Sequence, residues 1–147
     1  MPIELWKIPF SNLGSIIVWE ERLSLILVGF ENGSIICYRI QTEKKSKEYT
    51  LFNEVVKHIN CVTGMAVNPQ SGHLYSIGKD NYLITTDLSK PTTVLKEIDF
   101  LEELTYMLND KINKRLFISD GKGDIFILNY KEGPLQPLFQ IKPSKPL

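Results

Sequence analysis

The sequence repeats one local pattern three times: an apolar burst, a short polar turn and a second apolar burst. The turns centre on Gly33, Asn81 and Gly123, and the flanking bursts are LSLILVGF and SIICYRI, HLYSIG and YLITTDL, and RLFISD and DIFILNY. Short bursts rich in Ile, Val, Leu, Phe and Tyr and bounded by turn residues are typical of β-strands. Glycine and asparagine tolerate the positive φ of a tight turn best, so the pattern predicts three β-hairpins.

The spacing of these hairpins constrains the fold further. Their turn centres lie 48 and 42 residues apart, and a hairpin recurring at about 40–45 residues is the mark of a four-stranded β-propeller blade. Each hairpin is preceded by another burst (LGSIIVW, CVTGMAVN, ELTYMLND) and followed by one more (EYTLFNE, TTVLKEI, LQPLFQI). We therefore expect an all-β chain of three antiparallel blades, a partial or oligomer-completed propeller.

The predicted strands divide the chain into units. Residues 1–10, which contain IELWKIPF, form an orphan outer strand, and the three blades span 11–54, 55–99 and 100–147. The segment DFLEELTYML has an alternative, because its apolar residues also have helical spacing: Phe100, Leu101, Leu104 and Leu108. The register of the repeat favours a strand for the second half of that segment.

Composition and charge narrow the class of protein. The 147 residues are 43% hydrophobic and 23% charged, which is typical of a globular chain. Lys plus Arg equals Asp plus Glu, 17 against 17, which argues against a general nucleic-acid binder. The start MPIELWKIPF is no secretory signal, and no apolar run approaches the ~20 residues that span a bilayer. Cys37 and Cys61 lie in apolar stretches and are expected to be buried reduced thiols, which favours a cytoplasmic location.

The stretch KHINCVTGMAVNP…LYSIGKDN resembles the WD40 repeat, in which a histidine opens the inner strand and a Ser-x-Gly-x-Asp step ends the next. More narrowly, the segment from about Leu13 to Tyr130 resembles the second to fourth blades of WD-repeat proteins that also carry a FYVE zinc finger. That resemblance implies an endosome-associated adaptor. The sequence departs from the repeat at its eponymous Trp-Asp pair, which is Tyr38-Arg39, Thr86-Asp87 and Leu128-Asn129 here. Two cysteines cannot supply the zinc ligands of a FYVE finger, so no metal or other cofactor is expected.

Three residues of the second unit, His58, Ser76 and Asp80, allow two interpretations. They could be the base, nucleophile and orienting group of a hydrolase. However, Ser76 lies inside the predicted strand LYSIG, without the G-x-S-x-G elbow of such enzymes. The WD40 resemblance implies instead a structural hydrogen-bond network, so we expect no enzyme activity.

The network is expected to be specific to the second unit. Its fourth member, normally tryptophan, is Thr86, so the network is incomplete. Val18 and Val67 each stand eleven residues before a glycine, which aligns the first unit with the second. The first unit has Pro9, Leu27 and Asn32 at the positions that match His58, Ser76 and Asp80. These residues cannot form the network.

Two charged segments could bind ligands or lipid, but each is expected to be an ordinary turn or loop. DGKGD, from Asp120 to Asp124, has the composition of a phosphate or calcium loop but neither motif's spacing, so a hairpin turn is expected. EKKSKE, from Glu43 to Glu48, is expected to be a solvated loop. The alternative is a weak contact of its lysines with anionic lipid, through Lys44, Lys45 and Lys47.

The function predicted from the sequence is a non-catalytic protein–protein interaction scaffold. The candidate partner-binding residues lie in loops: Trp6, Lys7, Asn32, Lys79, Asn81, Lys122 and Asp124. Apart from Trp6, the six tyrosines and two tryptophans lie mostly in predicted strands and are expected in the core. The alternative is a structural subunit of a larger assembly, and any membrane contact would be weak or indirect.

The number of blades adds an expectation about partners. A propeller closes with about four to eight blades, so three leave two apolar faces open. Such faces would be covered in a longer propeller, by a second copy of the chain, or by another protein. We therefore expect a homo-oligomer or completion by another chain, and no stable monomer.

Overall fold

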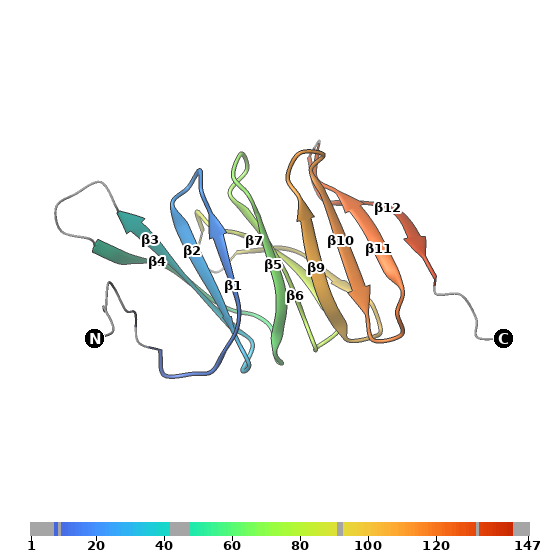
Figure 1. Ribbon diagram of the computed structural model, residues 1–147, viewed down its shortest axis with the longest axis horizontal. Coiled ribbons are helices and arrows are strands. Elements are labelled where there is room, and N and C mark those ends of the chain that lie inside the picture. Colours follow the sequence, from blue (N-terminus) through green and yellow to red (C-terminus); the bar gives the residue numbers. More distant parts are fainter. Residues whose placement is uncertain (1–7, 9, 42–47, 91–92, 132, 143–147) are drawn as a thin grey trace, which may run out of the picture.

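The fold was obtained as a computed structural model, which describes residues 8, 10–41, 48–90, 93–131 and 133–142. The described residues form three four-stranded antiparallel sheets that follow one another along the chain, with no helix among them (Figure 1). The first sheet consists of β1 (Gly14–Glu20), β2 (Leu25–Phe30), β3 (Ser34–Gln41) and β4 (Glu48–Val56). The middle sheet consists of β5 (Val62–Asn68), β6 (His73–Gly78), β7 (Tyr82–Asp87) and β8 (Val94–Asp99). The third sheet consists of β9 (Leu104–Asp110), β10 (Arg115–Asp120), β11 (Ile125–Asn129) and β12 (Gln136–Ile141).

This architecture confirms the all-β fold class. The helical alternative for DFLEELTYML is wrong, because Leu104–Asp110 is the strand β9, paired with β10. The turn centres have the expected backbone, with φ of 95° at Gly33, 76° at Asn81 and 88° at Gly123. Gly33 also has no room for a side chain, since a Cβ there would lie 2.1 Å from the carbonyl oxygen of His58.

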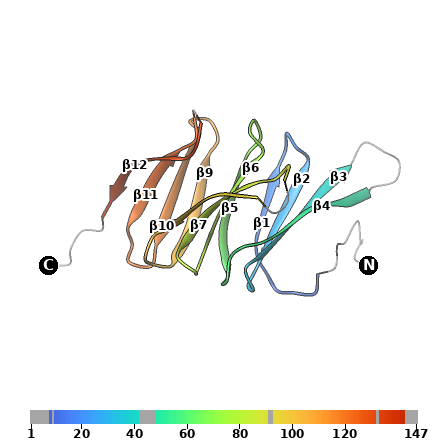
Figure 2. The same cartoon turned by 180° about the vertical axis from the view of Figure 1, so that it is seen from behind.

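The sheets stand side by side, and their inner strands β1, β5 and β9 contact one another in that order. Figure 2 shows the row from behind, with β4 and β12 at its two ends. The turns β2–β3, β6–β7 and β10–β11 lie at the lower end in Figure 1, and the turns β1–β2, β5–β6 and β9–β10 lie at the upper end. The repeat therefore brings like turns together.

One hydrogen bond between neighbouring sheets occurs twice. Ser15, at the irregularity in β1, donates its hydroxyl to the carbonyl oxygen of Val62 at 2.6 Å. Thr63, at the same irregularity in β5, donates to the carbonyl oxygen of Leu104 at 2.7 Å. Each bulge thus frees one hydroxyl that joins its sheet to the next inner strand.

Two hydrophobic clusters lie between the sheets. Between the first and middle sheets the buried residues are Leu25, Leu27, Ile35, Cys37, Val55, Val62, Met65, Val67, Leu74 and Leu88. Between the middle and third sheets they are Ala66, Tyr75, Ile77, Leu83, Leu104, Leu116, Ile118, Leu128, Tyr130 and Leu135. The middle sheet is therefore covered on both faces. Burial raises the pKa of the Cys37 thiol to about 12, and Cys61 is half-buried rather than fully buried.

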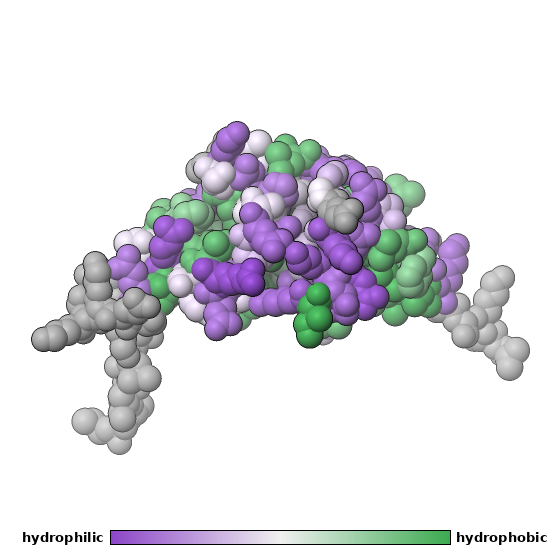
Figure 3. All heavy atoms as spheres, turned by 90° about the horizontal axis from the view of Figure 1, so that it is seen from above, coloured by the Kyte–Doolittle hydropathy of each residue, from purple (hydrophilic) through white to green (hydrophobic). Residues whose placement is uncertain are grey.

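The first and third sheets each have one face without a neighbouring sheet in the described residues. On the first sheet Ile17 is 63% and Trp19 is 46% exposed, and on the third sheet Tyr106 is 77% and Leu108 is 66% exposed. Figure 3 shows hydrophobic residues gathered toward both ends of the row. The expectation that the strand aromatics are in the core is therefore wrong for Trp19 and Tyr106. We call these surfaces the two end faces.

Candidate functional site

The structure brings His58, Ser76 and Asp80 together. The Nδ1 of His58 lies 2.9 and 3.0 Å from the two carboxylate oxygens of Asp80, and its Nε2 lies 2.8 Å from the hydroxyl of Ser76. A carboxylate can only accept, so Nδ1 carries the hydrogen. The same carboxylate accepts the backbone N–H groups of Ile59 and Tyr82 at 3.1 and 3.3 Å. The cluster thus joins the segment between β4 and β5, the strand β6 and the β6–β7 turn.

The order serine–histidine–aspartate is that of a hydrolase triad. Burial decides how it can act here, because the side chains of His58 and Asp80 are only 1% and 2% exposed. Ser76 is 1% exposed and lies within β6, which pairs with β5 on one side and β7 on the other. A nucleophile must meet its substrate, and this hydroxyl is enclosed. The geometry fits a group of hydrogen bonds that holds three segments in register; that role remains a prediction.

The cluster stops at Thr86, where the sequence lacks the tryptophan of the WD40 repeat. Thr86 is fully buried, and its hydroxyl has no hydrogen-bond partner among the described residues. A buried hydroxyl without a partner costs about 1–3 kcal/mol relative to one that is bonded. Thr86 therefore adds no hydrogen bond to the cluster and is itself a destabilising residue in β7.

Strand pairing corrects the alignment of the first unit with the second. Gly14 pairs with Phe30 as Val62 pairs with Gly78, so equivalent residues are 48 apart, not 49. The equivalents of His58 and Ser76 are then Phe10 and Val28, not Pro9 and Leu27; Pro9 itself lies outside the described residues. Asn32 was placed correctly.

The glycine match that suggested the wrong spacing has a physical explanation. A Cβ at Gly78 would lie 2.8 Å from Asp80 Oδ1 and 2.9 Å from His58 Nδ1, so Gly78 leaves room for that pair. A Cβ at Gly29 would instead lie 2.8 Å from the side chain of Val62 in the next sheet. The two glycines look equivalent in the sequence but face different neighbours.

The other two sheets fill the histidine position with an aromatic ring. Phe10 packs edge-on against Phe30, with ring centroids 5.2 Å apart. In the third sheet, where the spacing is 42, the equivalent Phe100 packs against Phe126 at 4.7 Å. Only the middle sheet, among the described residues, therefore uses polar groups at this position.

The predicted partner-binding residues that the structure describes all lie in the turns at one end of the molecule. They are Asn32 in the β2–β3 turn, Lys79 and Asn81 in the β6–β7 turn, and Lys122 and Asp124 in the β10–β11 turn (Figure 1). Trp6 and Lys7 lie outside the described residues, as do Lys44, Lys45 and Lys47. The repeat thus brings together five residues that are as much as 92 positions apart in the sequence.

Several of these side chains already have partners within the chain. Asn32 accepts the backbone N–H and the hydroxyl of Ser34 at 3.0 and 2.8 Å. Lys122 pairs with Glu102 at 3.1 Å, and this hydrogen bond raises the pKa of the lysine. Lys79 is exposed. A partner would therefore meet a partly ordered polar surface.

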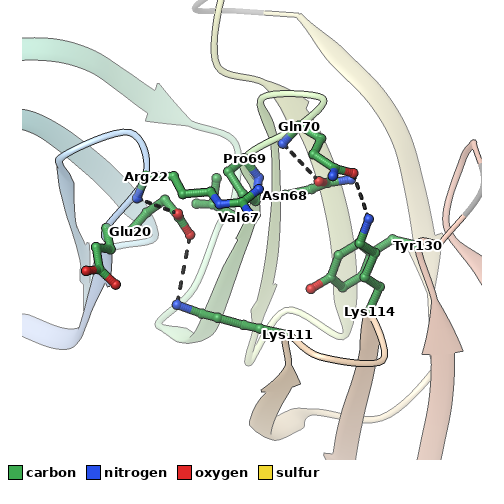
Figure 4. Close-up of a pocket in the computed structure, with 10 residues that line it drawn as sticks. Glu20, Arg22, Val67, Asn68, Pro69, Gln70, Lys111, Lys114 and Tyr130 are labelled. Carbon is green, nitrogen blue, oxygen red and sulfur yellow. Dashed lines mark hydrogen bonds and ion pairs between the residues drawn. The ribbon is translucent and has the colours of Figure 1, made fainter.

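Sequence reasoning missed a cavity at the opposite end of the molecule. Its volume is about 250 Å³, and it lies among the β1–β2, β5–β6 and β9–β10 turns (Figure 4). The buried carboxylate of Glu20 lies 4.0 Å from the Nζ of Lys111, and Lys114 donates to the side-chain oxygen of Gln70 at 2.7 Å. These contacts join the third sheet to the other two. No sequence motif predicts these contacts, because each turn contributes only a few residues.

The described residues contain no group of three or more His, Cys, Asp or Glu side chains placed to hold a metal ion. They also contain no helix that is long and apolar enough to cross a membrane.

The chain matches no protein-family model and no curated protein sequence. Its structure is similar to the β-propeller domain of Cps50 (Swd1) from Myceliophteria thermophila, with a TM-score of 0.71 and 12% identity. The likeness covers 93% of this chain and 42% of that domain, so the chain spans less than half its length. A chain of the mitotic checkpoint complex is also similar, with a TM-score of 0.45 and 12% identity over 88% of this chain and 53% of that one. At 12% identity the first likeness establishes the fold: the three sheets are blades of a β-propeller type.

Proposed function

We propose that this chain is a non-catalytic protein-interaction scaffold that works in the cytoplasm. The observation that carries the proposal is the gathering of three hairpin turns at one end of a row of propeller blades. Rigid strands hold the turns, and loops held on a rigid framework are common binding surfaces. The exposed Lys79 and its neighbours in the other two turns would provide the contacts.

The test is a comparison of two surfaces of the same purified chain. A turn variant would carry Asn32→Ala, Lys79→Ala and Asp124→Ala, and a control variant would carry substitutions of exposed residues in β8, Lys96→Ala and Glu97→Ala. Cross-linking and mass spectrometry should identify proteins that bind the wild type and the control but not the turn variant. If all three chains recover the same proteins, the turns are not the binding surface.

The non-catalytic part of the proposal rests on the burial of Ser76. A fluorophosphonate, which labels activated serines, should leave Ser76 unmodified in the folded chain. Labelling at Ser76 that depends on His58 would favour the hydrolase interpretation instead.

A second candidate is a structural subunit of a larger assembly, which the two apolar end faces favour. Both candidates need these faces to be covered by further blades. A constant stoichiometry with one set of neighbours would favour the subunit, and exchange among several partners would favour the scaffold.

The narrower proposal of an endosome-associated adaptor is supported only by the resemblance of the blades to those of FYVE-containing WD-repeat proteins. The chain has too few cysteines for a FYVE finger of its own, so any recruitment to endosomes would be indirect. Fractionation of cells expressing the tagged chain tests this: enrichment with endosomes is expected, and uniform cytosolic distribution would contradict it.

A further inference from the structure

The inner strand of each sheet carries a hydroxyl at the same position. Ser15 and Thr63 use it to bond to the next sheet, at the carbonyl oxygens of Val62 and Leu104. The third sheet has Thr105 at this position. The register of β9 against β10 shifts there, so Thr105 has no strand-pairing partner in β10. Thr105 has no following sheet among the described residues, and its hydroxyl bonds instead to Ser119 of its own sheet, 2.8 Å from the Ser119 hydroxyl. The third sheet therefore carries the donor for a fourth sheet.

The first sheet carries the matching acceptor. The residues whose carbonyls accept these bonds, Val62 and Leu104, begin β5 and β9, and each pairs with the residue that ends the next strand. The equivalent residue of the first sheet is Gly14, which pairs with Phe30 in the same way. No hydrogen bond from a side chain reaches the Gly14 carbonyl in the described part of the chain.

The shapes of the two end faces also suit each other. The first sheet has an apolar cavity of about 420 Å³ beside Ile17 and Trp19, lined also by Ile26, Val28 and Ile40. The third sheet presents two large exposed apolar side chains, Tyr106 and Leu108. Tyr106 is the equivalent of Gly64, because Tyr106 pairs with Ser119 as Gly64 pairs with Ile77. In the middle sheet, Gly64 faces Met107 of the third sheet. Met107 is equivalent to Ile17, so Tyr106 would reach this cavity.

We propose that the end face of the third sheet binds the end face of the first sheet of a second copy of this chain, in the geometry that already joins consecutive sheets. Thr105 then donates to the carbonyl oxygen of Gly14 in the second copy, and Tyr106 fills the apolar cavity. The chain has a formal net charge of zero, so two copies do not repel one another through their net charge. This inference shares one premise with the proposed function, namely that further blades cover the end faces. It does not depend on the binding of partners at the turns.

A cysteine pair tests the geometry directly. A Cβ at Gly29 would lie 2.9 Å from the Cβ of Val62 in the next sheet, and the equivalents of these two residues are Ser119 and Gly14. Chains carrying Ser119→Cys and chains carrying Gly14→Cys, both with Cys61→Ser, are mixed and oxidised. The expected product is a disulfide between position 119 of one chain and position 14 of the other, at least tenfold more abundant than with Lys96→Cys in place of Gly14→Cys.

Two results would overturn the inference. A disulfide mainly between two copies of Ser119→Cys would mean that third sheets pair with each other, and no excess over the Lys96→Cys control would mean that a second copy does not cover the face. Both results leave the turn-variant experiment on the proposed function unaffected.

The hydrogen bond of Thr105 has its own test. Thr105→Val should weaken self-association about fivefold, the effect of one lost hydrogen bond, whereas Thr105→Ser should restore it. Thr50→Val, an exposed threonine in β4, is the matched control and should have no effect. Equal self-association of the Val and Ser variants would rule out this bond.

Discussion

The middle sheet and the first sheet have the same strand order and nearly the same alternation of residues, yet they differ in what covers them. Met65 in β5 is 6% exposed, whereas its equivalent in β1, Ile17, is 63% exposed. Val67 is 2% exposed and its equivalent Trp19 is 46% exposed. The side chains are apolar in both sheets, so the neighbouring sheet causes the difference. The end faces are exposed because no sheet among the described residues covers them.

The same comparison explains why the polar cluster is found where it is. His58, Ser76 and Asp80 lie between two sheets that exclude water, where a complete set of hydrogen bonds is strong and an incomplete one is costly. The equivalent residues of the first sheet, Phe10 and Val28, line its exposed apolar cavity. An apolar pair there loses little while uncovered and gains free energy when another sheet covers it.

The largest expected difference between the two sheets comes from a charge at equivalent positions. Met65→Asp should lower the free energy of unfolding by more than about 4 kcal/mol, because it places a carboxylate between two sheets. Ile17→Asp should change it by less than about 0.5 kcal/mol when the chain is dilute enough not to self-associate, because Ile17 is exposed in the single chain. Urea unfolding followed by circular dichroism measures both. Equal losses would mean that the end face is covered within the chain.

A second difference concerns the residue that precedes the centre of each hairpin turn, Asp80 in the middle sheet and Asn32 in the first. Asp80→Ala should cost about 3 kcal/mol, because it leaves the buried His58 ring and two backbone N–H groups without their acceptor. Asn32→Ala, at the equivalent position, should cost about 1 kcal/mol, since it removes hydrogen bonds to Ser34 alone. Chemical denaturation of the two variants gives the comparison, and similar costs would show that the cluster adds no stability.

A third experiment converts the middle sheet into the first. His58→Phe alone should cost about 2 kcal/mol, because the buried Ser76 and Asp80 lose a partner. The combination of His58→Phe, Ser76→Val and Asp80→Asn, which reproduces the residues of the first sheet, should cost less than the sum of its three single changes. The measurement is the free energy of unfolding of the three single variants and the triple variant. Strictly additive costs would mean that the three residues do not act together.

The smallest expected effect is a gain. Thr86→Val keeps the shape of the side chain and removes the buried hydroxyl that has no partner, so it should raise the free energy of unfolding by about 1 kcal/mol. Thr50→Val, at an exposed position, is the control and should change little. Loss of stability in Thr86→Val would reveal a hydrogen bond to this hydroxyl.

The strands and turns of this fold could be predicted because each depends on local sequence. Alternation of apolar residues sets the strands, and Gly33, Asn81 and Gly123 set the turns. The cluster of His58, Ser76 and Asp80 was expected only from the resemblance to the WD40 repeat, since no other unit of the chain carries these three residues.

Two open apolar faces were predicted from the number of blades, but the residues exposed on them could not be identified, because Ile17 and Met65 look alike in the sequence and differ only in their neighbours. The predicted alignment of the first unit with the second was wrong by one residue for a related reason. Gly29 and Gly78 are both glycines, one making room for Val62 and the other for the His58–Asp80 pair. Identity of residue type can thus hide a shift of one position, which in a strand reverses the face.

If further blades cover the end faces of this row, the purified chain should self-associate, and sedimentation velocity over a range of micromolar concentrations measures this. Species heavier than the 16.9 kDa chain are expected, and their fraction should rise with concentration and fall in Ile17→Asp. A single 16.9 kDa species that unfolds cooperatively at every concentration would contradict that expectation.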